Sequence, residues 1–338
     1  MVTTQAVAGD YVHQVNTLIG TKGTGLTSGY LYPGATYPYG MVQFTPSYFS
    51  KRSGFVINQL SGGGCEHMGN FPTFPVSPDN ILNYRINVSE EKGHAGYYEA
   101  MVQEDIKAKL TVTERTGMAS YEYPADQQYG TIIIGGGISA TPIEQAAIVI
   151  TAPNKCEGYA EGGNFCGLRT PYKVYFVAEF DTDAFETGTW KREELMPNTT
   201  FAEGEYSGVY FTFDVNKKKN IQYKIGVSYV SVENARENLK AENAEWDFQK
   251  IQNQAEAKWN HYLGMIEVEG TNPDRTTQFY THLYRSFIHP NVCSDVNGEY
   301  MGADFRVHKS RSKHYTSFSN WDTYRTQIQL LSDRKSVV

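Results

Sequence analysis

Up to about residue 234, the chain is a series of short segments with β-branched or aromatic residues at every second position. Examples are IKAKLTVTERT (106–116), YKVYFVAEFD (172–181) and IQYKIGVSYVSV (221–232), and turn-forming residues flank them. A period of two is typical of strands with one buried face. Because no helical pattern separates these segments, the sequence predicts a mainly β fold, with a large antiparallel β-sandwich over residues 10–234.

The composition changes at residue 233. From there to residue 266 the chain is rich in Ala, Glu, Lys, Gln and Leu, which favour helices. Its large apolar residues can share one helical stripe: Leu239, Trp246, Ile251 and Trp259. The pattern predicts a helical linker over residues 235–265, with one or two helices that end near Gly264.

A further helical pattern occupies PDRTTQFYTHLYRSFIHPN (273–291). Pro273 suits a first helical turn, and Pro290 marks a stop. Another helix is expected to begin near Trp321. Because 338 residues exceed the usual size of one hydrophobic core, residues 266–338 are interpreted as the opening helices of a second domain.

The overall composition excludes some classes of partner. The net charge is −7 and there is no basic block, so nucleic acid is not an expected partner. No run of eighteen apolar residues occurs, so no transmembrane segment is expected. The first residues, MVTTQAVAGDYVHQ, lack the basic and apolar parts of a signal peptide. The protein is therefore either cytoplasmic or has lost a signal peptide.

The cysteines and histidines give few signals by themselves. No CxxC pair occurs, which argues against a zinc site built from cysteines. Cys156 and Cys166 bracket a Gly-rich segment, and their spacing permits either a short disulfide loop or two free thiols. The eight histidines are scattered, and His282 and His289 are interpreted as packed or surface residues.

The loop LSGGGCEHMGNFP (60–72) is a candidate ligand-binding loop. Its glycines allow sharp bends and a close approach by a ligand. Cys65, Glu66 and His67 are polar groups that such a loop could present. The alternative is a surface loop without a ligand.

The segment SNWDTYRTQ (319–327) is the second candidate. On a helix, Asp322 and Arg325 lie one turn apart on the same face. Their hydrogen bonds could hold vicinal hydroxyls, and Trp321 could stack on a sugar ring. Chemistry alone also allows an intrahelical ion pair beside a core tryptophan, and it favours that alternative.

Several of these motifs together resemble one known family. The order is VNTLIGTKGTG (15–25), YPGATYPYGMVQFTP (32–46), GVSYVSVENARENL (226–239), FYTHLYRSFIHPN (279–291) and FSNWDTYRT (318–326). This order resembles the glycoside hydrolase family 92 α-mannosidases, from about residue 12 to about residue 331. None of the motifs is specific alone, and their order makes the resemblance specific.

The resemblance implies a fold and an activity. The β-sandwich and the helical linker would be followed, from residue 266 to residue 338, by the first helices of a truncated (α/α)6 barrel. Members of the family are secreted or periplasmic exo-α-mannosidases that release mannose from glycans with inversion. They use Ca²⁺ to bind and distort the sugar. The expected partner is thus a mannose-containing glycan, and the expected location is outside the cytoplasm.

The resemblance also implies roles for residues. Trp321 and Asp322 would line the subsite of the terminal mannose, with Arg325 as support. Cys65, Glu66 and His67 would face the leaving-group sugar.

The catalytic carboxylates and most calcium ligands of the family lie farther along the chain than residue 338. We therefore expect no catalytic residue here and an inactive fragment. Asp295, Glu299 and Asp304 are interpreted as loop or solvent residues rather than as the catalytic acid. The alternative function is a carbohydrate-binding sandwich without catalysis, and the oligomeric state stays open.

Overall fold

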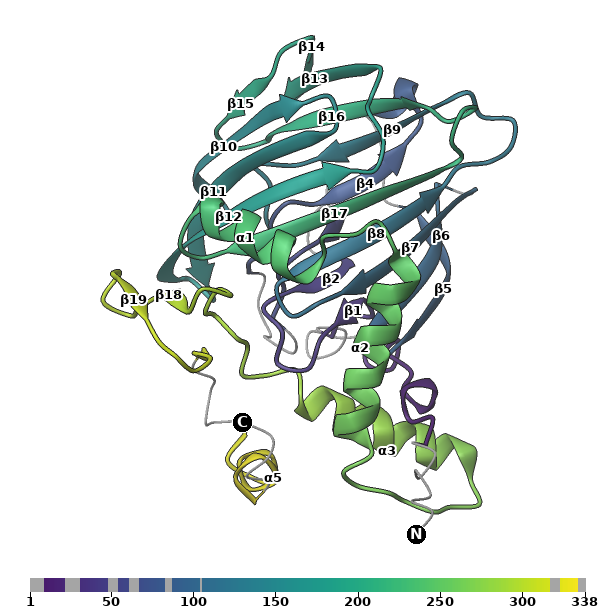
Figure 1. Ribbon diagram of the computed structural model, residues 1–338, viewed down its shortest axis with the longest axis vertical. Helices are drawn as coiled ribbons and strands as arrows, with labels where there is room; N and C mark the ends of the chain where they lie inside the picture. Colours follow the sequence, from purple (N-terminus) through teal and green to yellow (C-terminus); the bar gives the residue numbers. More distant parts are fainter. Residues whose placement is uncertain are drawn as a thin grey trace.

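The computed structural model shows two antiparallel sheets that face each other, with helices gathered beside one end of the sandwich (Figure 1). The antiparallel β-sandwich predicted from the two-residue period is confirmed. The structure describes residues 9–21, 31–47, 54–60, 67–82, 87–103, 105–316 and 323–333.

Within the described residues, the first sheet has eight strands. Their order across the sheet is β1 (Ala35–Thr36), β2 (Gln43–Pro46), β3 (Phe55–Val56), β4 (Thr73–Val76), β9 (Tyr129–Ile134), β16 (Ser207–Asp214), β13 (Glu186–Lys191) and β14 (Glu194–Pro197). The second sheet has nine strands in the part of the chain that is described. Their order is β15 (Phe201–Glu203), β10 (Ile143–Ala152), β11 (Lys155–Phe165), β12 (Leu168–Phe180), β17 (Asn220–Ser228), β8 (Thr116–Glu122), β7 (Ile106–Val112), β6 (Tyr97–Val102) and β5 (Val88–His94).

The period-two pattern fixes which face of each strand is buried. In β7, Ile106, Ala108 and Leu110 are buried, whereas Lys107 and Lys109 between them are partly exposed. Side chains of this kind from both sheets form one continuous core. Each fully buried large apolar side chain contributes about 1.5–3 kcal/mol, so this core accounts for the pairing of the two sheets.

The helices follow the sandwich in the chain. They are α1 (Val232–Glu242), α2 (Phe248–Leu263), α3 (Pro273–Ser286) and α5 (Gln327–Asp333), with the short helices η1 (Val12–Gln14) and η2 (Pro78–Asn80) before them and the hairpin of β18 (Glu299–Met301) and β19 (Val307–Lys309) near the end. Side-chain oxygens of Ser231, Asp247 and Asn272 accept backbone N–H groups at the first turns of α1, α2 and α3. None of the described helices is long and apolar enough to cross a membrane.

Helix α1 packs on the outer face of the second sheet (Figure 1). Ala235 and Leu239 of the helix contact Val177 of β12. A Cβ atom at Gly226 of β17 would lie 2.5 Å from the Ala235 carbonyl oxygen. The close approach of helix and sheet therefore requires glycine at this position.

A second core joins the helices to the sandwich, and Trp259 of α2 lies at its centre. The indole is fully buried, and its ring lies 4.6 Å from that of Tyr284 on α3. Its Nε1 donates a hydrogen bond of 2.7 Å to the carbonyl oxygen of Thr36 in β1. One side chain thus connects α2, α3 and the first sheet.

The segment of residues 11–19, which we call the N-terminal strap, is held by helices far along the chain. Asn260 of α2 accepts the backbone N–H groups of Tyr11 and Val12 at 2.9 Å and 3.0 Å. Thr281 of α3 accepts the N–H of Asn16, and Arg285 donates to the carbonyl oxygen of Thr17. The strap is therefore fixed by contacts that span about 250 residues of sequence.

Asp295 lies in a loop, as expected, but it is not a solvent residue. Its side chain is 2% exposed, and its carboxylate accepts hydrogen bonds from Ser228 (2.7 Å), Asn234 (2.8 Å) and Asn238 (2.7 Å). Burial raises the pKa of Asp295, and these three hydrogen bonds and the charge of Arg115 oppose that rise. The carboxylate ties α1 and the end of β17 to the segment after α3.

The structure contradicts the predicted possibility of a disulfide bond between Cys156 and Cys166. Cys156 is a free thiol with its side chain in the core, whereas Cys166 is disulfide-bonded, so the alternative of two free thiols is also wrong. The two residues stand ten positions apart along β11 and the turn that follows it. Ten residues of strand span about 33 Å, and a disulfide needs Cα atoms within about 7 Å.

Replacing Trp259 by Phe removes the buried hydrogen bond from the indole to the Thr36 carbonyl oxygen and part of the ring that packs in the second core. We expect the free energy of unfolding to fall by about 2–4 kcal/mol, measured by urea denaturation. The matched control is Trp246→Phe, because Trp246 is 36% exposed. It should cost less than about 1 kcal/mol. Equal losses in the two variants would contradict the role given to Trp259.

Candidate functional site

The structure describes two of the six predicted site residues. They are His67 in the loop before β4 and Arg325 before α5. The other four lie outside the described residues, and their roles stay predictions: Cys65, Glu66, Trp321 and Asp322.

His67 is a buried residue, which argues against a loop that lies wholly at the surface. It is 4% exposed, and its ring meets that of Phe165 edge-on at 5.1 Å. Phe165 ends β11, so this part of the loop packs against the β11–β12 hairpin. The backbone that follows is strongly bent, with positive φ at Met68 (52°), Gly69 (74°) and Phe71 (53°). Non-glycine residues seldom adopt this conformation, and such strain gathers at functional sites.

Amide side chains continue the buried polar surface beside His67. The Tyr172 hydroxyl donates to Oδ1 of Asn70 at 2.8 Å, and the backbone N–H of Asn70 donates to Oδ1 of Asn58 at 2.8 Å. Among the described residues, Nδ2 of Asn70 and Oε1 of Gln59 have no hydrogen-bond partner, although both are shielded from solvent. Unpartnered buried polar atoms are costly, and they mark places where a ligand or water can bind.

His289 reaches the same region from the segment after α3. Burial, with a smaller effect from His67, lowers the pKa of His289 to about 4, and a hydrogen bond with Asn291 opposes that shift. Its Nε2 is shielded from solvent and has no hydrogen-bond partner within the described part of the chain. Sequence reasoning treated His289 as packed or surface. The one local sign of a special position for His289 was its place next to Pro290, where the helical pattern stops.

The backbone around His289 is fixed to the first sheet. Asn291 donates to the Gly40 carbonyl oxygen at 2.8 Å, and Gln43 of β2 donates to the same oxygen at 2.9 Å. Two segments from distant parts of the chain therefore meet at one carbonyl. We call His67, Asn70, Gln59 and His289 the junction cluster. It offers imidazole and amide groups that can hydrogen-bond to a neutral polyhydroxylated ligand.

The side chain of Arg325 is exposed, so Arg325 is not part of the buried junction cluster. Its guanidinium carbon lies 5.7 Å from the ring centroid of Tyr324. Next to it, α5 is attached to α3 by a hydrogen bond from Gln327 to the Ser286 carbonyl oxygen at 3.0 Å. The structure thus brings His67, but not Arg325, into the buried polar region.

Glu114 and Glu242 are two described carboxylates with a structural role. Glu114 and Glu242 both accept a hydrogen bond of 2.6 Å from Nη1 of Arg115. Arg115 is 5% exposed, and its Nε also donates to the Ser294 carbonyl oxygen at 2.7 Å. Its raised pKa follows from these two carboxylates, whose charges outweigh the cost of burying the guanidinium. Both carboxylates therefore hold Arg115 in place.

The described residues include one group of three His, Cys, Asp or Glu side chains that could hold a metal ion. It consists of His13, His94 and Glu256, whose ligand atoms all lie within 4.8 Å of one another. Two imidazoles do not fit calcium, which takes oxygen ligands. This group therefore does not match the calcium ion that the resemblance implies.

Family models match almost the whole chain. The model of the glycosyl hydrolase family 92 N-terminal domain matches residues 14–228, and that of the family 92 catalytic domain matches residues 234–333. The first range ends with β17, and the second begins in α1. The sandwich limits drawn from the sequence (10–234) differ from the first range by four residues at one end and six at the other, whereas the second range also includes residues 235–265, which were predicted as a linker. The predicted domain limits therefore stay predictions.

Similar proteins come from Arthroderma benhamiae and Bacteroides thetaiotaomicron. An uncharacterized secreted glycosidase of Arthroderma benhamiae is 26% identical over 94% of this chain and 46% of its own length. A family 92 α-mannosidase of Bacteroides thetaiotaomicron, also solved with mannoimidazole, is 25% identical with a TM-score of 0.84. That match covers 96% of this chain and 47% of the mannosidase. The chain spans about half the length of these relatives.

A second structure of Bacteroides thetaiotaomicron supports the fold alone. It is a family 92 inverting mannosidase with a TM-score of 0.81 and 22% identity. The alignment covers 97% of this chain and 46% of that one. The arrangement of the two sheets and the helices beside them is therefore shared among these proteins.

His289 should make the protein sensitive to acid. Its folded pKa of about 4 lies below its ordinary value of 6.5, so the unfolded state binds a proton that the folded state excludes. The contribution of His289 to the free energy of unfolding is fully present above pH 6.5 and is lost as the pH falls toward 4. We expect a loss of about 2–3 kcal/mol over that window, and the variant His289→Gln should lack it.

The measurement is urea denaturation at several pH values between about 7 and about 4.5. The control is His282→Gln, because His282 is exposed on α3. This variant should keep the slope of the unchanged protein. A His289→Gln variant with that same slope would refute the assignment.

Proposed function

The chain belongs to glycosyl hydrolase family 92, and on that basis we propose that it forms the N-terminal part of an exo-α-mannosidase. The proposed enzyme acts on mannose-containing glycans, is secreted, depends on calcium and inverts the anomeric configuration. One observation carries the proposal: 96% of this chain superposes on a family 92 α-mannosidase with a TM-score of 0.84. The secreted relative supports the proposed location.

The proposed contribution of the described residues is to bind the sugar. In the junction cluster, Nδ2 of Asn70 and Nε2 of His289 are buried polar atoms without a partner among the described residues. Hydroxyl groups of a sugar could donate to or accept from such atoms. A ligand that satisfied them would recover the free energy that their isolation costs. We assign this cluster and Arg325 to substrate binding, together with the four predicted residues outside the description.

The proposed reaction needs two carboxyl groups on opposite sides of the scissile bond. An inverting glycosidase uses one to protonate the leaving oxygen and the other to activate water, about 6.5–9.5 Å away. Glu114 and Glu242 are bound to Arg115, and Asp295 accepts three side-chain hydrogen bonds. We therefore place the acid and the base in the half of the relatives that this chain does not span. We place most of the calcium ligands there too, and the unsuitability of the described group of two imidazoles and one carboxylate for that ion supports this placement.

The test measures mannose release from an aryl α-mannoside with and without EDTA. The 338-residue chain should give no turnover, whereas a protein that also carries the second half of a family 92 enzyme should give turnover that EDTA abolishes and Ca²⁺ restores. Proton NMR of the first product should show β-mannose, as inversion requires.

Two other outcomes would change the conclusion. Turnover by the 338-residue chain alone would refute the placement of the catalytic carboxylates outside it. If the longer protein is inactive but the 338-residue chain binds mannose in calorimetry, the chain is a carbohydrate-binding sandwich without catalysis.

A further inference from the structure

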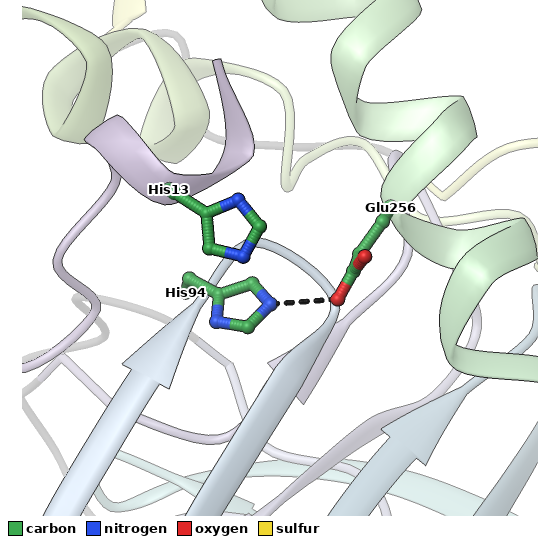
Figure 2. Close-up of side chains that lie close together, drawn as sticks. All are labelled: His13, His94 and Glu256. Atoms are coloured by element: carbon green, nitrogen blue, oxygen red, sulfur yellow. Dashed lines mark hydrogen bonds and ion pairs between the residues drawn. The ribbon is translucent and has the colours of Figure 1, made fainter. Parts of the chain in front are cut away.

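Three metal-binding side chains from distant parts of the sequence converge beside the second sheet (Figure 2). His13 belongs to η1, His94 is the last residue of β5, and Glu256 lies in the middle of α2. Figure 2 shows both imidazoles and the carboxylate directed toward a common space. Nε2 of His94 and Oε1 of Glu256 are 2.8 Å apart, and the two imidazole rings lie 4.6 Å apart.

Neighbouring groups fix the orientation of the three side chains. Asp10 contacts Nδ1 of His13 at 2.6 Å, which leaves Nε2 as the free nitrogen of that ring. Gln252 donates to Oε1 of Glu256 at 2.7 Å. The ring of His94 stacks on that of Tyr97 at 5.0 Å. In many metal sites, a carboxylate accepts a hydrogen bond from the histidine nitrogen that does not bind the metal. This contact fixes the tautomer of the ring and raises the basicity of the nitrogen that binds the metal.

We propose that His13, His94 and Glu256 form a binding site for a divalent transition-metal ion of the zinc class. Two imidazole nitrogens and one carboxylate oxygen are a ligand set that zinc accepts, with water in the fourth position. Ligand atoms around tetrahedral zinc lie about 3.4 Å apart, so a set already within 4.8 Å needs only a small adjustment. His13 can supply it because its side chain is 55% exposed and lies on a helix of three residues.

Binding replaces a hydrogen bond with metal–ligand bonds. The ion takes the place of the proton between Nε2 of His94 and Oε1 of Glu256. A neutral His94 ring then carries its proton on Nδ1, whereas a protonated ring keeps the Nδ1 proton and releases the other to solvent. His13 then closes the third position through Nε2. No electron transfer is involved, and zinc keeps its oxidation state.

The ion would have a structural effect. His13 and His94 are 81 positions apart, and His94 and Glu256 are 162 apart. One ion would therefore link the N-terminal strap, the edge strand of the second sheet and α2. A crosslink across such long loops stabilises the folded state more than a short one does. This inference stands independently of the proposed mannosidase activity.

The test titrates Zn²⁺ into EDTA-treated, dialysed protein by isothermal calorimetry, and Co²⁺ as a spectroscopic probe. We expect one equivalent to bind with a dissociation constant in the micromolar range or below, and to raise the thermal unfolding midpoint. Co²⁺ should give the intense visible absorption of a four-coordinate site. His94→Ala and Glu256→Gln should each abolish this binding, and Asp10→Asn should weaken it about 10- to 100-fold.

The control variant removes a histidine from a different His–Asp pair on the surface, outside the proposed site. His308 lies 2.9 Å from Asp304 in an exposed pair, so His308→Gln should bind zinc like the unchanged protein. Because His13 is exposed, His13→Asn should fold normally, so a loss of binding in this variant cannot be attributed to misfolding. It should also lose the visible spectrum of four-coordinate Co²⁺. Binding unchanged in His94→Ala, or no binding to the unchanged protein at millimolar zinc, would refute the site. So would a sulfur-to-cobalt absorption band, because it would show cysteine ligands.

Discussion

The hydrogen bond from the Trp259 indole to the Thr36 carbonyl oxygen joins two hydrophobic cores that are otherwise separate. The indole ring packs on Tyr284, and its Nε1 donates to strand β1. Gly96 permits the approach, since a Cβ atom there would lie 3.0 Å from Ala255 Cβ and 3.3 Å from the indole. The position of α2, and with it that of α3, follows from this contact.

Polar networks then fix the segment after α3 against the sandwich. Asn291 and Gln43 share one carbonyl oxygen, Arg115 bridges two glutamates and a backbone oxygen, and Asp295 accepts three side-chain donors. Removing one partner of such a buried network leaves the others unsatisfied, so the arrangement is rigid. His289 is carried on this rigid segment. Its distance from the sandwich loop is therefore set by the fold and not by a flexible linker.

The sequence predicted the elements well where the information is local. The alternation in β7 and the start of α3 at Pro273 are readable from neighbouring residues. The failures concern long-range geometry. The span of β11 excludes a bond between Cys156 and Cys166, and the burial of Asp295 depends on α1, about 60 residues earlier in the chain. The cluster of His13, His94 and Glu256 could not be found either, because no local pattern joins residues so far apart.

The N-terminal strap has a consequence for synthesis on the ribosome. Its partners Asn260, Thr281 and Arg285 are made some 250 residues after the strap itself. At about 5–20 residues per second, the strap emerges roughly 10–50 s before the groups that bind it. The strands between them can pair during that interval, since their partners are present earlier. The first described segment of the chain is thus among the last to dock, and its docking reports that α2 and α3 have formed.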